Sequence, residues 1–457
     1  MRLAVPFSDA LAEQVRGLAR RTGQHVSGVV AEAVSRCVHK GPPSTFPGAG
    51  QTRMLSALCL VLLAAASPLQ STSRTAGSYP SVAPPDTTGT AAVAARWRAL
   101  DVALFTAAPE PADTPLLRGL KALVAADVDA ADSALAEALA AAPDALRPFV
   151  RARLADVAAE RFDWAAAVAR RAVDDPQAVH SVEAGFARFP AARLRMDAAE
   201  TTVPFDGLRV PAALNGAPVR AVVDTGAPGS SVSRALALRL GLRVDTTARG
   251  RSRVPSLGLA FDTYAVLLDS VRLGEATLFN VPATVGWRDA ADEDEIFLGA
   301  DVLRHLAAAV RFDYVDSTFT LVRSATAWPS PDDRPNFLVD AGSAPVVAVT
   351  VAGQPANAIV DTGNQRSVYL ARGAFDLAGV PVSRTLSGTY PGGTWTQAFV
   401  RLPVAIPGHP PLVLEAYEAE GVFQAGDPVT VVLGRTVWAG GALTVDFAHR
   451  RVRFDAR

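Results

Sequence analysis

Two short apolar runs, each ending in a carboxylate, stand out in the pattern of hydrophobic and polar positions. They read Ala221-Val222-Val223-Asp224-Thr225-Gly226 and Ala358-Ile359-Val360-Asp361-Thr362-Gly363. An apolar run of this length before a turn tripeptide predicts a buried strand that delivers its last residue to a loop. A buried carboxylate is tolerated only where it is paired, hydrogen-bonded or used in chemistry. The two aspartates, 137 positions apart, are therefore candidate functional residues.

The surroundings of the two runs repeat in the same order, which indicates an internal duplication. In each copy a turn precedes the run, a short helix closed by glycine follows it, an apolar strand ending in Leu-Gly comes next, and a strand pair closes the copy. The first copy has these elements at 215–218, 234–240, 296–299, and 310–313 with 319–321. The second copy has them at 352–355, 370–378, 431–434, and 443–447 with 452–454. We expect Asp301 and Thr436, which follow the two Leu-Gly pairs, to cap the next helix. The pattern predicts two β-rich lobes, at 200–325 and 335–457.

Alanine-rich sequence with helical periodicity fills residues 91–196. Within it, the segments 129–135 and 163–169 align at a spacing of 34, and each is followed by a helix that ends near a proline, Pro143 or Pro176. A helical period of 34 residues resembles tetratricopeptide repeats, and this resemblance implies a scaffold that presents a surface to a protein partner. An ordinary alanine-rich helical bundle fits the same composition. Both interpretations predict an all-α domain without a catalytic cluster.

An apolar segment at 54–66 has the layout of a secretory signal peptide. It follows Arg53, is too short to span a bilayer comfortably, and ends in Ala64-Ala65-Ala66, a small-x-small cleavage pattern. We therefore expect export to the periplasm or the medium, and no stable membrane span. The Ser-, Thr-, Pro- and Gly-rich residues 67–90 are predicted to be a linker.

Residues 1–53 precede this segment and are interpreted in two ways. A predicted strand followed by two helices resembles the ribbon-helix-helix DNA-binding fold, but only Arg2 fits the polar strand that reads bases. Our preferred hypothesis is that translation starts at Met54, so that these residues arise from gene calling. A cytoplasmic head on a short membrane anchor is the alternative.

Composition narrows the function classes. The 457 residues are 49% hydrophobic and 19% charged, which is typical of a soluble protein with several globular domains. A net charge of −1 argues against a general attraction to nucleic acid or anionic membranes, so no nucleic-acid partner is expected. The two cysteines, Cys37 and Cys59, precede the predicted domains, and the histidines show no metal-ligand spacing. We expect no metal and no cofactor.

The paired lobes resemble the retropepsin-like aspartic proteases, especially the bacterial members. The resemblance rests on the two Asp-Thr-Gly runs, on Leu273-Gly274 with Phe279-Asn280-Val281-Pro282, and on the segment 297–303. In that family each lobe donates one aspartate and two lobes build one site. The resemblance implies tandem all-β acid-protease-like lobes that form a pseudo-dimer, with Asp224 and Asp361 as the catalytic pair. It also implies that the flanking loop residues support the pair; these are Thr225, Gly226, Thr362 and Gly363.

The chemistry of the residues supports the same function. Two carboxylates about 3 Å apart cannot both ionise, so they share a proton. The ionised member would take a proton from water while the protonated member polarises the scissile carbonyl. We therefore predict an aspartic-type endopeptidase, a hydrolase acting on a peptide or protein substrate. The apparent pKa values belong to the pair, so neither role is assigned to one aspartate.

A substrate-covering flap is predicted between the second Asp-Thr-Gly and its Leu-Gly strand. Glycines would give it mobility and aromatic rings would cover the substrate; the candidates are Gly388, Tyr390, Gly392, Gly393 and Trp395. The second site departs from the family, because Asn364 stands where Ala or Ser usually follows and where the first site has Ala227. This leaves two alternatives open: a catalytically inactive peptide-binding pseudoprotease that acts as an interaction module, and lobes that pair between two chains.

Overall fold

A computed structural model describes residues 89–254, 259–286, 295–324, 335–339, 344–390, 393–406, 409–424 and 426–456. The segments predicted as a ribbon-helix-helix-like unit and as a signal peptide lie outside these residues, as does nearly all of the predicted linker. Ala83–Ser383 and Phe399–Arg457 form one compact unit, and Arg384–Ala398 fall outside it. In the described ranges no helix is both long and apolar enough to cross a membrane.

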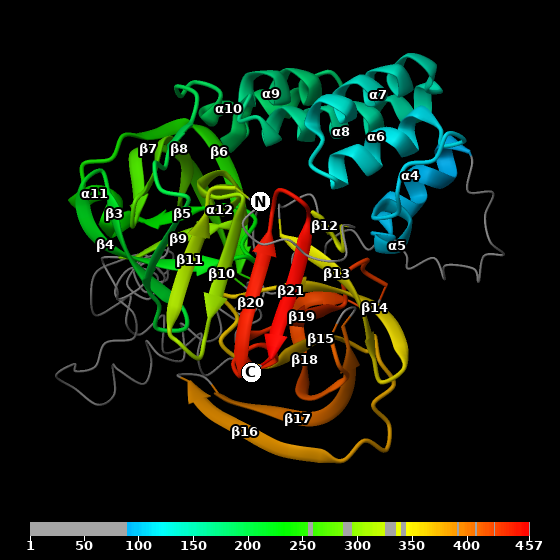
Figure 1. Ribbon diagram of the computed structural model, residues 1–457, viewed down its shortest axis with the longest axis vertical. Helices are drawn as coiled ribbons and strands as arrows, with labels where there is room; N and C mark the ends of the chain where they lie inside the picture. The colour runs from blue at the N-terminus through cyan, green and yellow to red at the C-terminus, as the bar shows by residue number, and fades with distance from the viewer. Residues whose placement is uncertain are drawn as a thin grey trace, which may run out of the picture. The chain divides into compact units, whose positions relative to one another are not determined.

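Helices occupy the alanine-rich region of the described chain (Figure 1). They are α4 (Thr90–Arg98), α5 (Val102–Phe105), α6 (Pro115–Val124), α7 (Val128–Ala141), α8 (Arg147–Glu160), α9 (Trp164–Ala172) and α10 (Val182–Phe186), with 3₁₀ turns η1 (Asp144–Leu146) and η2 (Pro176–His180).

The same turn joins α6 to α7 and α8 to α9. Ala126 and Phe162 adopt left-handed backbone conformations, with φ of 60° and 55°, and the next residue in each case is an aspartate that caps the following helix. The caps are Asp127 and Asp163, so the alignment of Asp129 with Asp163 is two residues out of register. The turns repeat at a spacing of 36 rather than 34. The assignment to tetratricopeptide repeats stays a prediction.

Each β-rich lobe is a closed ring of six strands in the described chain, and the two rings have the same order. In the first, the order around the ring is β3 (Arg209–Leu214), β4 (Ala217–Asp224), β9 (Glu295–Gly299), β5 (Ser231–Ser233), β8 (Ala276–Gly286) and β7 (Leu259–Leu273). In the second, it is β13 (Pro345–Val351), β14 (Gln354–Val360), β19 (Val431–Leu433), β15 (Val368–Arg372), β18 (Leu412–Gln424) and β17 (Gly393–Ala405). The remaining strands of these two sheets are β1 (Arg193–Arg195), β6 (Val244–Val254), β12 (Phe337–Val339) and β16 (Val382–Tyr390). The prediction of two β-rich lobes is confirmed, with one closed ring of six strands in each.

The two-residue hairpin turns predicted before each Asp-Thr-Gly run are present. Asn215 and Gly216 in the first lobe have φ of 50° and 82°, and Ala352 and Gly353 in the second have φ of 49° and 80°. A hairpin turn with two positive φ values matches the right-handed twist of its strands. The turns therefore set the register that brings each aspartate to the end of its strand.

Two helix predictions are wrong in part. Helix α11 (Arg234–Arg239) lies where the first lobe predicts it, but residues 370–378 form the end of β15 and then turns. Leu370 pairs with both β18 and β19, so sheet pairing overrides its helix propensity. Asp301 and Thr436 are not N-caps, because α12 (Ala300–Leu306) and η5 (Arg435–Val437) begin directly after Gly299 and Gly434.

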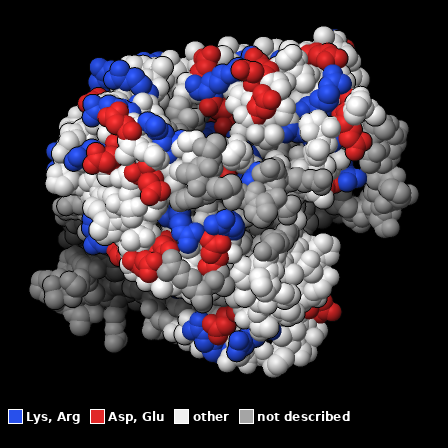
Figure 2. Space-filling view, in the orientation of Figure 1, with Lys and Arg blue, Asp and Glu red and all other residues white. Residues whose placement is uncertain are grey.

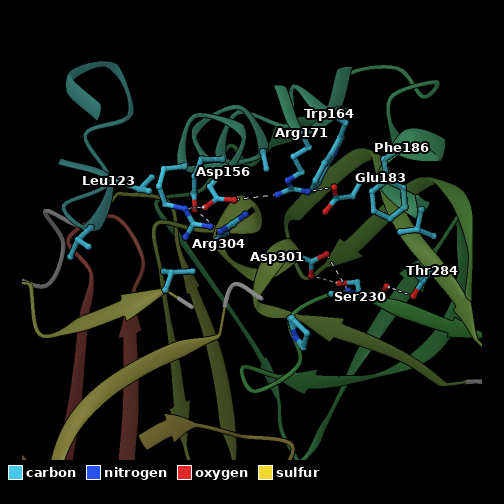
Figure 3. A pocket seen from close by; sticks show the side chains of 18 of the residues that line it. Leu123, Asp156, Trp164, Arg171, Glu183, Phe186, Ser230, Thr284, Asp301 and Arg304 are labelled. Carbon is cyan, nitrogen blue, oxygen red and sulfur yellow. Dashed lines mark hydrogen bonds and ion pairs between the residues drawn. The ribbon is translucent and has the colours of Figure 1, made fainter. Parts of the chain in front are cut away.

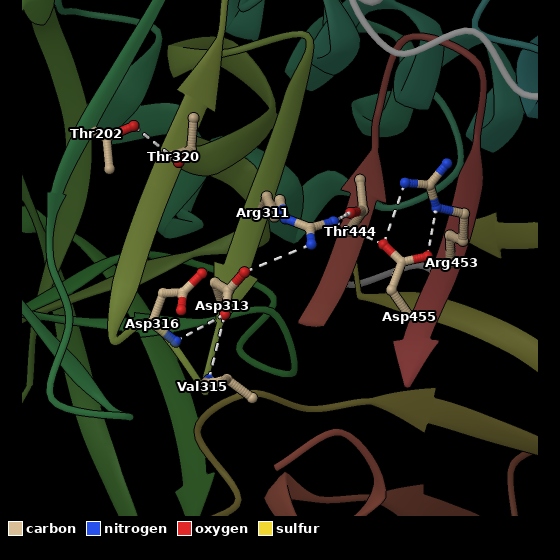
Figure 4. Close-up of polar contacts among 9 residues, drawn as sticks. All are labelled: Thr202, Arg311, Asp313, Val315, Asp316, Thr320, Thr444, Arg453 and Asp455. Carbon is tan, nitrogen blue, oxygen red and sulfur yellow. Dashed lines mark hydrogen bonds and ion pairs between the residues drawn. The ribbon is translucent and has the colours of Figure 1, made fainter. Parts of the chain in front are cut away.

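A third sheet joins the two lobes. It runs in the order β2 (Glu200–Pro204), β11 (Thr318–Val322), β10 (Ala309–Asp313), β20 (Gly441–Asp446) and β21 (Arg451–Ala456), so β10 of the first lobe pairs with β20 of the second (Figure 1). Arg311 on β10 crosses the junction to donate to Asp455 at 2.6 Å and to Thr444 at 3.3 Å (Figure 4). Phe312 and its partner Leu443 are fully buried. The lobes therefore share one hydrophobic core.

The helices pack on both lobes. On the first lobe, α10 places Phe186 against Ala248 and Ala265. On the second, α4 to α8 share a core cluster with Leu338 and Val346. The helical segment is thus part of the same compact unit as the β lobes.

Candidate active site

The structure brings the two Asp-Thr-Gly loops together. Asp224 is the last residue of β4, and Asp361 directly follows β14. Thr225 and Thr362 are fully buried between them, and each threonine hydrogen-bonds across the junction. The Thr225 N–H donates to Thr362 Oγ1 at 3.0 Å and the Thr362 N–H donates to Thr225 Oγ1 at 3.1 Å.

The threonine hydroxyls complete a reciprocal set of four bonds. The Thr225 hydroxyl donates to the carbonyl of Val360 at 2.6 Å, and the Thr362 hydroxyl donates to that of Val223 at 2.8 Å. Both carbonyls belong to the strands that deliver the aspartates. The two strand ends are therefore fixed to each other as well as to their own lobes.

The glycines of both loops lie against the opposite carboxyl group. A Cβ atom placed on Gly226 would come within 3.0 Å of the Asp361 side chain, and one on Gly363 would come within 3.0 Å of the Asp224 side chain. Protein Cβ atoms are not found this close to other heavy atoms. Only glycine lets the two loops approach far enough for the carboxyl groups to meet.

The two carboxyl groups are hydrogen-bonded to each other and to backbone N–H groups. Asp224 Oδ1 accepts from the N–H groups of Gly226 and Ala227, both at 3.0 Å, and Asp361 Oδ1 accepts from that of Asn364 at 2.9 Å. Burial raises the pKa of Asp361, and the charge of Asp224 raises it further. Burial also raises the pKa of Asp224, while the hydrogen bond from Asp361 and the N–H donors oppose that rise. These shifts favour a pair that shares one proton.

Asn364, the departure in the second loop, turns its side chain away from the carboxyl pair. It is buried, its Oδ1 accepts from the Arg366 N–H at 3.0 Å, and its Nδ2 donates to the Ser367 carbonyl at 3.0 Å. Its own N–H still donates to Asp361. The Asn364 side chain thus stabilises the loop on the side away from the carboxyl pair, while its backbone N–H stays bonded to Asp361.

The first loop is stabilised differently, by Ser230, which the sequence did not point to, and by Asp301, which was predicted only as a helix cap. The Ser230 hydroxyl donates to Asp301 Oδ1 at 2.8 Å, and the Ser230 N–H donates to Asp301 Oδ2 at 3.1 Å. An acidic residue two positions after Leu-Gly is the signal in the sequence that could have pointed to this contact. Its interpretation as a helix cap concealed the role.

An aromatic pair near Asp361 was also missed. Tyr369 on β15 and Tyr417 on β18 have ring centroids 4.6 Å apart and hydrogen-bonded hydroxyls. Burial raises the pKa of Tyr369, and the nearby charge of Asp361 adds to the rise. The strand register places Ser231 and Thr284 at the equivalent positions of the first lobe. The surroundings of the two aspartates are therefore unlike.

The flap candidates fall in strands β16 and β17 or between them. Gly388 and Tyr390 are in β16, Gly393 and Trp395 are in β17, and Gly392 lies outside the described residues. All five belong to the segment outside the main compact unit. Their role in covering a substrate stays a prediction.

Two features bear on other kinds of site. The described residues contain no group of three or more His, Cys, Asp or Glu side chains placed to hold a metal ion. On the face shown in Figure 2, basic and acidic side chains of the described residues are interspersed rather than gathered into a patch of one sign.

Comparison with known proteins gives a family match in the first lobe. Residues 210–302, which include Asp224 but not Asp361, match the family model described as aspartyl protease. No curated protein sequence matches the chain. The chain is similar to the crystal structure of a retropepsin-like aspartic protease from Rickettsia conorii, with 22% identity, a TM-score of 0.21 and coverage of 29% of this chain and 93% of that chain. It is also similar to an aspartic proteinase from Irpex lacteus, with 12% identity, a TM-score of 0.37 and coverage of 56% and 96%.

Proposed function

We propose that this protein is an aspartic-type endopeptidase whose site is formed by both lobes of one chain. The observation that carries the proposal is the hydrogen-bonded pair of Asp224 and Asp361, fixed by the reciprocal bonds of Thr225 and Thr362. Two partly buried carboxyl groups in contact are costly to maintain, and acid–base chemistry is the use that such a pair serves.

The chemistry needs one proton on the pair. The ionised carboxylate takes a proton from a bound water molecule, whose oxygen forms a bond to the peptide carbonyl carbon. The protonated carboxyl donates a hydrogen bond to the carbonyl oxygen, where negative charge develops. The C–N bond then breaks as a proton from the pair passes to the leaving amine. A carboxylic acid and an amine are released, and the pair again holds one proton.

The experiment is cleavage of a mixed peptide library at acidic and neutral pH, with products identified by mass spectrometry. Asp224→Asn and Asp361→Asn should each reduce the rate by about 10³-fold or more, because each removes one half of the acid–base pair. Asp144→Asn, which changes a side chain that is 94% exposed, serves as the control. If wild type and the double Asp→Asn variant give the same cleavage products, the enzyme proposal fails. The alternative, a catalytically inactive peptide-binding module, is then favoured.

Substantial activity in one single variant would favour separate sites between two chains. The contact between Asp224 and Asp361 within one chain supports the single-chain site instead. Flap residues Gly388, Tyr390, Gly392, Gly393 and Trp395 are proposed to cover the substrate, and loss of binding on Trp395→Ala would test this role.

Export and a protein partner on the helices are further parts of the proposal. The apolar segment at 54–66 and its small-x-small end support secretion to the periplasm or the medium. N-terminal sequencing of the exported protein should find a mature end near Ser67. An intact Met1 would contradict it.

A further inference from the structure

Helix α12 directly supports the loop that carries Asp224. The Ala300 N–H donates to the carbonyl of Ala227 at 3.0 Å, and Asp301 holds Ser230 with both carboxylate oxygens. Figure 3 shows the Asp301 side chain directed at Ser230. Ala227 is also the residue whose N–H donates to Asp224. Because Ala227 is bonded to both α12 and Asp224, a shift of α12 would change the position of Asp224.

The helical domain holds the same helix through Glu160, the last residue of α8. Arg304 on α12 donates to Glu160 Oε1 at 2.7 Å, and His305 Nε2 lies 3.1 Å from the Glu160 carbonyl oxygen. The imidazole of His305 also lies against the Phe162 ring, with centroids 3.6 Å apart and ring planes tilted by 36°. The Arg304 and Glu160 side chains are only 7% and 13% exposed, so solvent screens their attraction weakly.

The second oxygen of Glu160 binds the second lobe. Arg450, in the turn between β20 and β21, donates to Glu160 Oε2 at 3.2 Å, and its side chain is 3% exposed. Its φ of 54° lies in the left-handed region that favours glycine. The equivalent residue in the turn between β10 and β11 is Ser317, with the same φ and an exposed side chain. The turn geometry therefore does not call for an arginine, whereas the ion pair with Glu160 does.

This cluster lies beside a cavity of about 250 Å³ between the helices and the lobes (Figure 3). The cavity is lined by Trp164 and Phe186 from the helices and by Pro228 and Ser230 from the Asp224 loop. The helices thus do not pack continuously against that loop. Along this part of the contact, Glu160 connects them through α12.

We propose that Glu160 is a positioning residue for the paired aspartates: it binds Arg304 of one lobe and Arg450 of the other, and through α12 it fixes the loop of Asp224. The inference rests on the proposed protease function. It makes the helical domain an integral part of the enzyme in addition to any surface it offers to a partner.

The test compares Glu160→Gln with Glu137→Gln. Glu137 makes the same kind of contact, to Arg118, but its side chain is 60% exposed and this ion pair lies within the helical region. In Glu160→Gln, hydrogen exchange should rise at residues 224–230 and 299–306, and kcat should fall about tenfold at little-changed KM, because a misplaced reacting group loses rate before binding. Glu137→Gln should match wild type in both measurements.

A second variant covers the case in which Glu160→Gln does not fold. The apolar packing of Phe186 and of the cluster around Leu338 is untouched by the substitution, so the domain should stay folded. Should Glu160→Gln unfold, Glu160→Asp keeps the charge on a shorter side chain and should show a smaller change in exchange and kcat. Equal exchange at residues 224–230 in the Glu160 and Glu137 variants would overturn the inference, whether or not the protein cleaves peptides. If wild type cleaves nothing but exchange rises as stated, the protease proposal fails and the coupling stands.

Discussion

Gly226 of the first lobe lies directly against the carboxyl group of Asp361 in the second, with no room for a Cβ atom between them. The closest part of the contact between the lobes is therefore also the place where the proposed chemistry occurs. Any change that separates the loops separates the carboxyl groups.

Gly226→Ala should abolish cleavage while leaving the fold largely intact. The added methyl group would push Asp361 out of its hydrogen bond with Asp224, and a displacement of this kind costs about 100-fold or more in rate. The control is Gly440→Ala, because nothing lies within 4 Å of a Cβ atom there and its φ is not positive. Peptide cleavage and thermal unfolding of the two variants give the answer. Full activity in Gly226→Ala would show that the carboxyl groups need not touch.

Replacement of the buried threonines should lower stability. Thr225→Val and Thr362→Val each leave a buried carbonyl and a buried N–H without a partner, so each should lower the free energy of unfolding by about 1–3 kcal/mol. The two substitutions remove different bonds of one set, so the departure of the double variant from the sum of the single losses measures the coupling between the two loops. Chemical denaturation measures these values. Thr202→Val, which breaks an exposed bond to Thr320, should change little (Figure 4).

The paired aspartates should make the protein less stable as the pH rises. Asp361 has an ordinary pKa of 3.8 when unfolded and a raised one when folded, so the folded state binds its proton more tightly. The stabilisation is complete below pH 3.8 and is lost as the pH rises through the raised folded value. Asp361→Asn removes this dependence and should be more stable than wild type at neutral pH, with the difference shrinking in acid. Denaturation curves at a series of pH values test it; a constant difference would contradict it.

The aromatic pair should influence which peptides are cut. Tyr369→Ser gives the second lobe the residue that the first lobe has at Ser231. Loss of the ring should reduce kcat/KM roughly tenfold for peptides with a large apolar side chain near the scissile bond, and less for peptides with small side chains. Cleavage profiles of the same library before and after the substitution measure this shift. An unchanged profile would place Tyr369 outside the substrate's reach.

The duplication could be predicted from sequence because it depends on local patterns, whereas the meeting of the two Asp-Thr-Gly loops, 137 positions apart, followed only from the resemblance to a family. Turns, apolar runs and Leu-Gly strands recur in one order, and each is a short-range signal. The helix predicted at 370–378 is wrong because Leu370 pairs with Glu418 and Val431, which lie 48 and 61 positions later and outside any local window. Asp301 was misassigned for a related reason, since its partner Ser230 lies 71 positions earlier. The link from Glu160 to Arg450 spans 290 positions and left no local signal.

The pairing of β10 with β20 has a consequence for any attempt to study one lobe alone. A chain cut between the lobes would expose a buried strand of five or six residues as an open edge, with its backbone N–H and C=O groups unpaired. Such edges recruit other strands, so an isolated lobe should either self-associate through that edge or aggregate. Fragments that hold both lobes and the helices are the ones expected to remain monomeric.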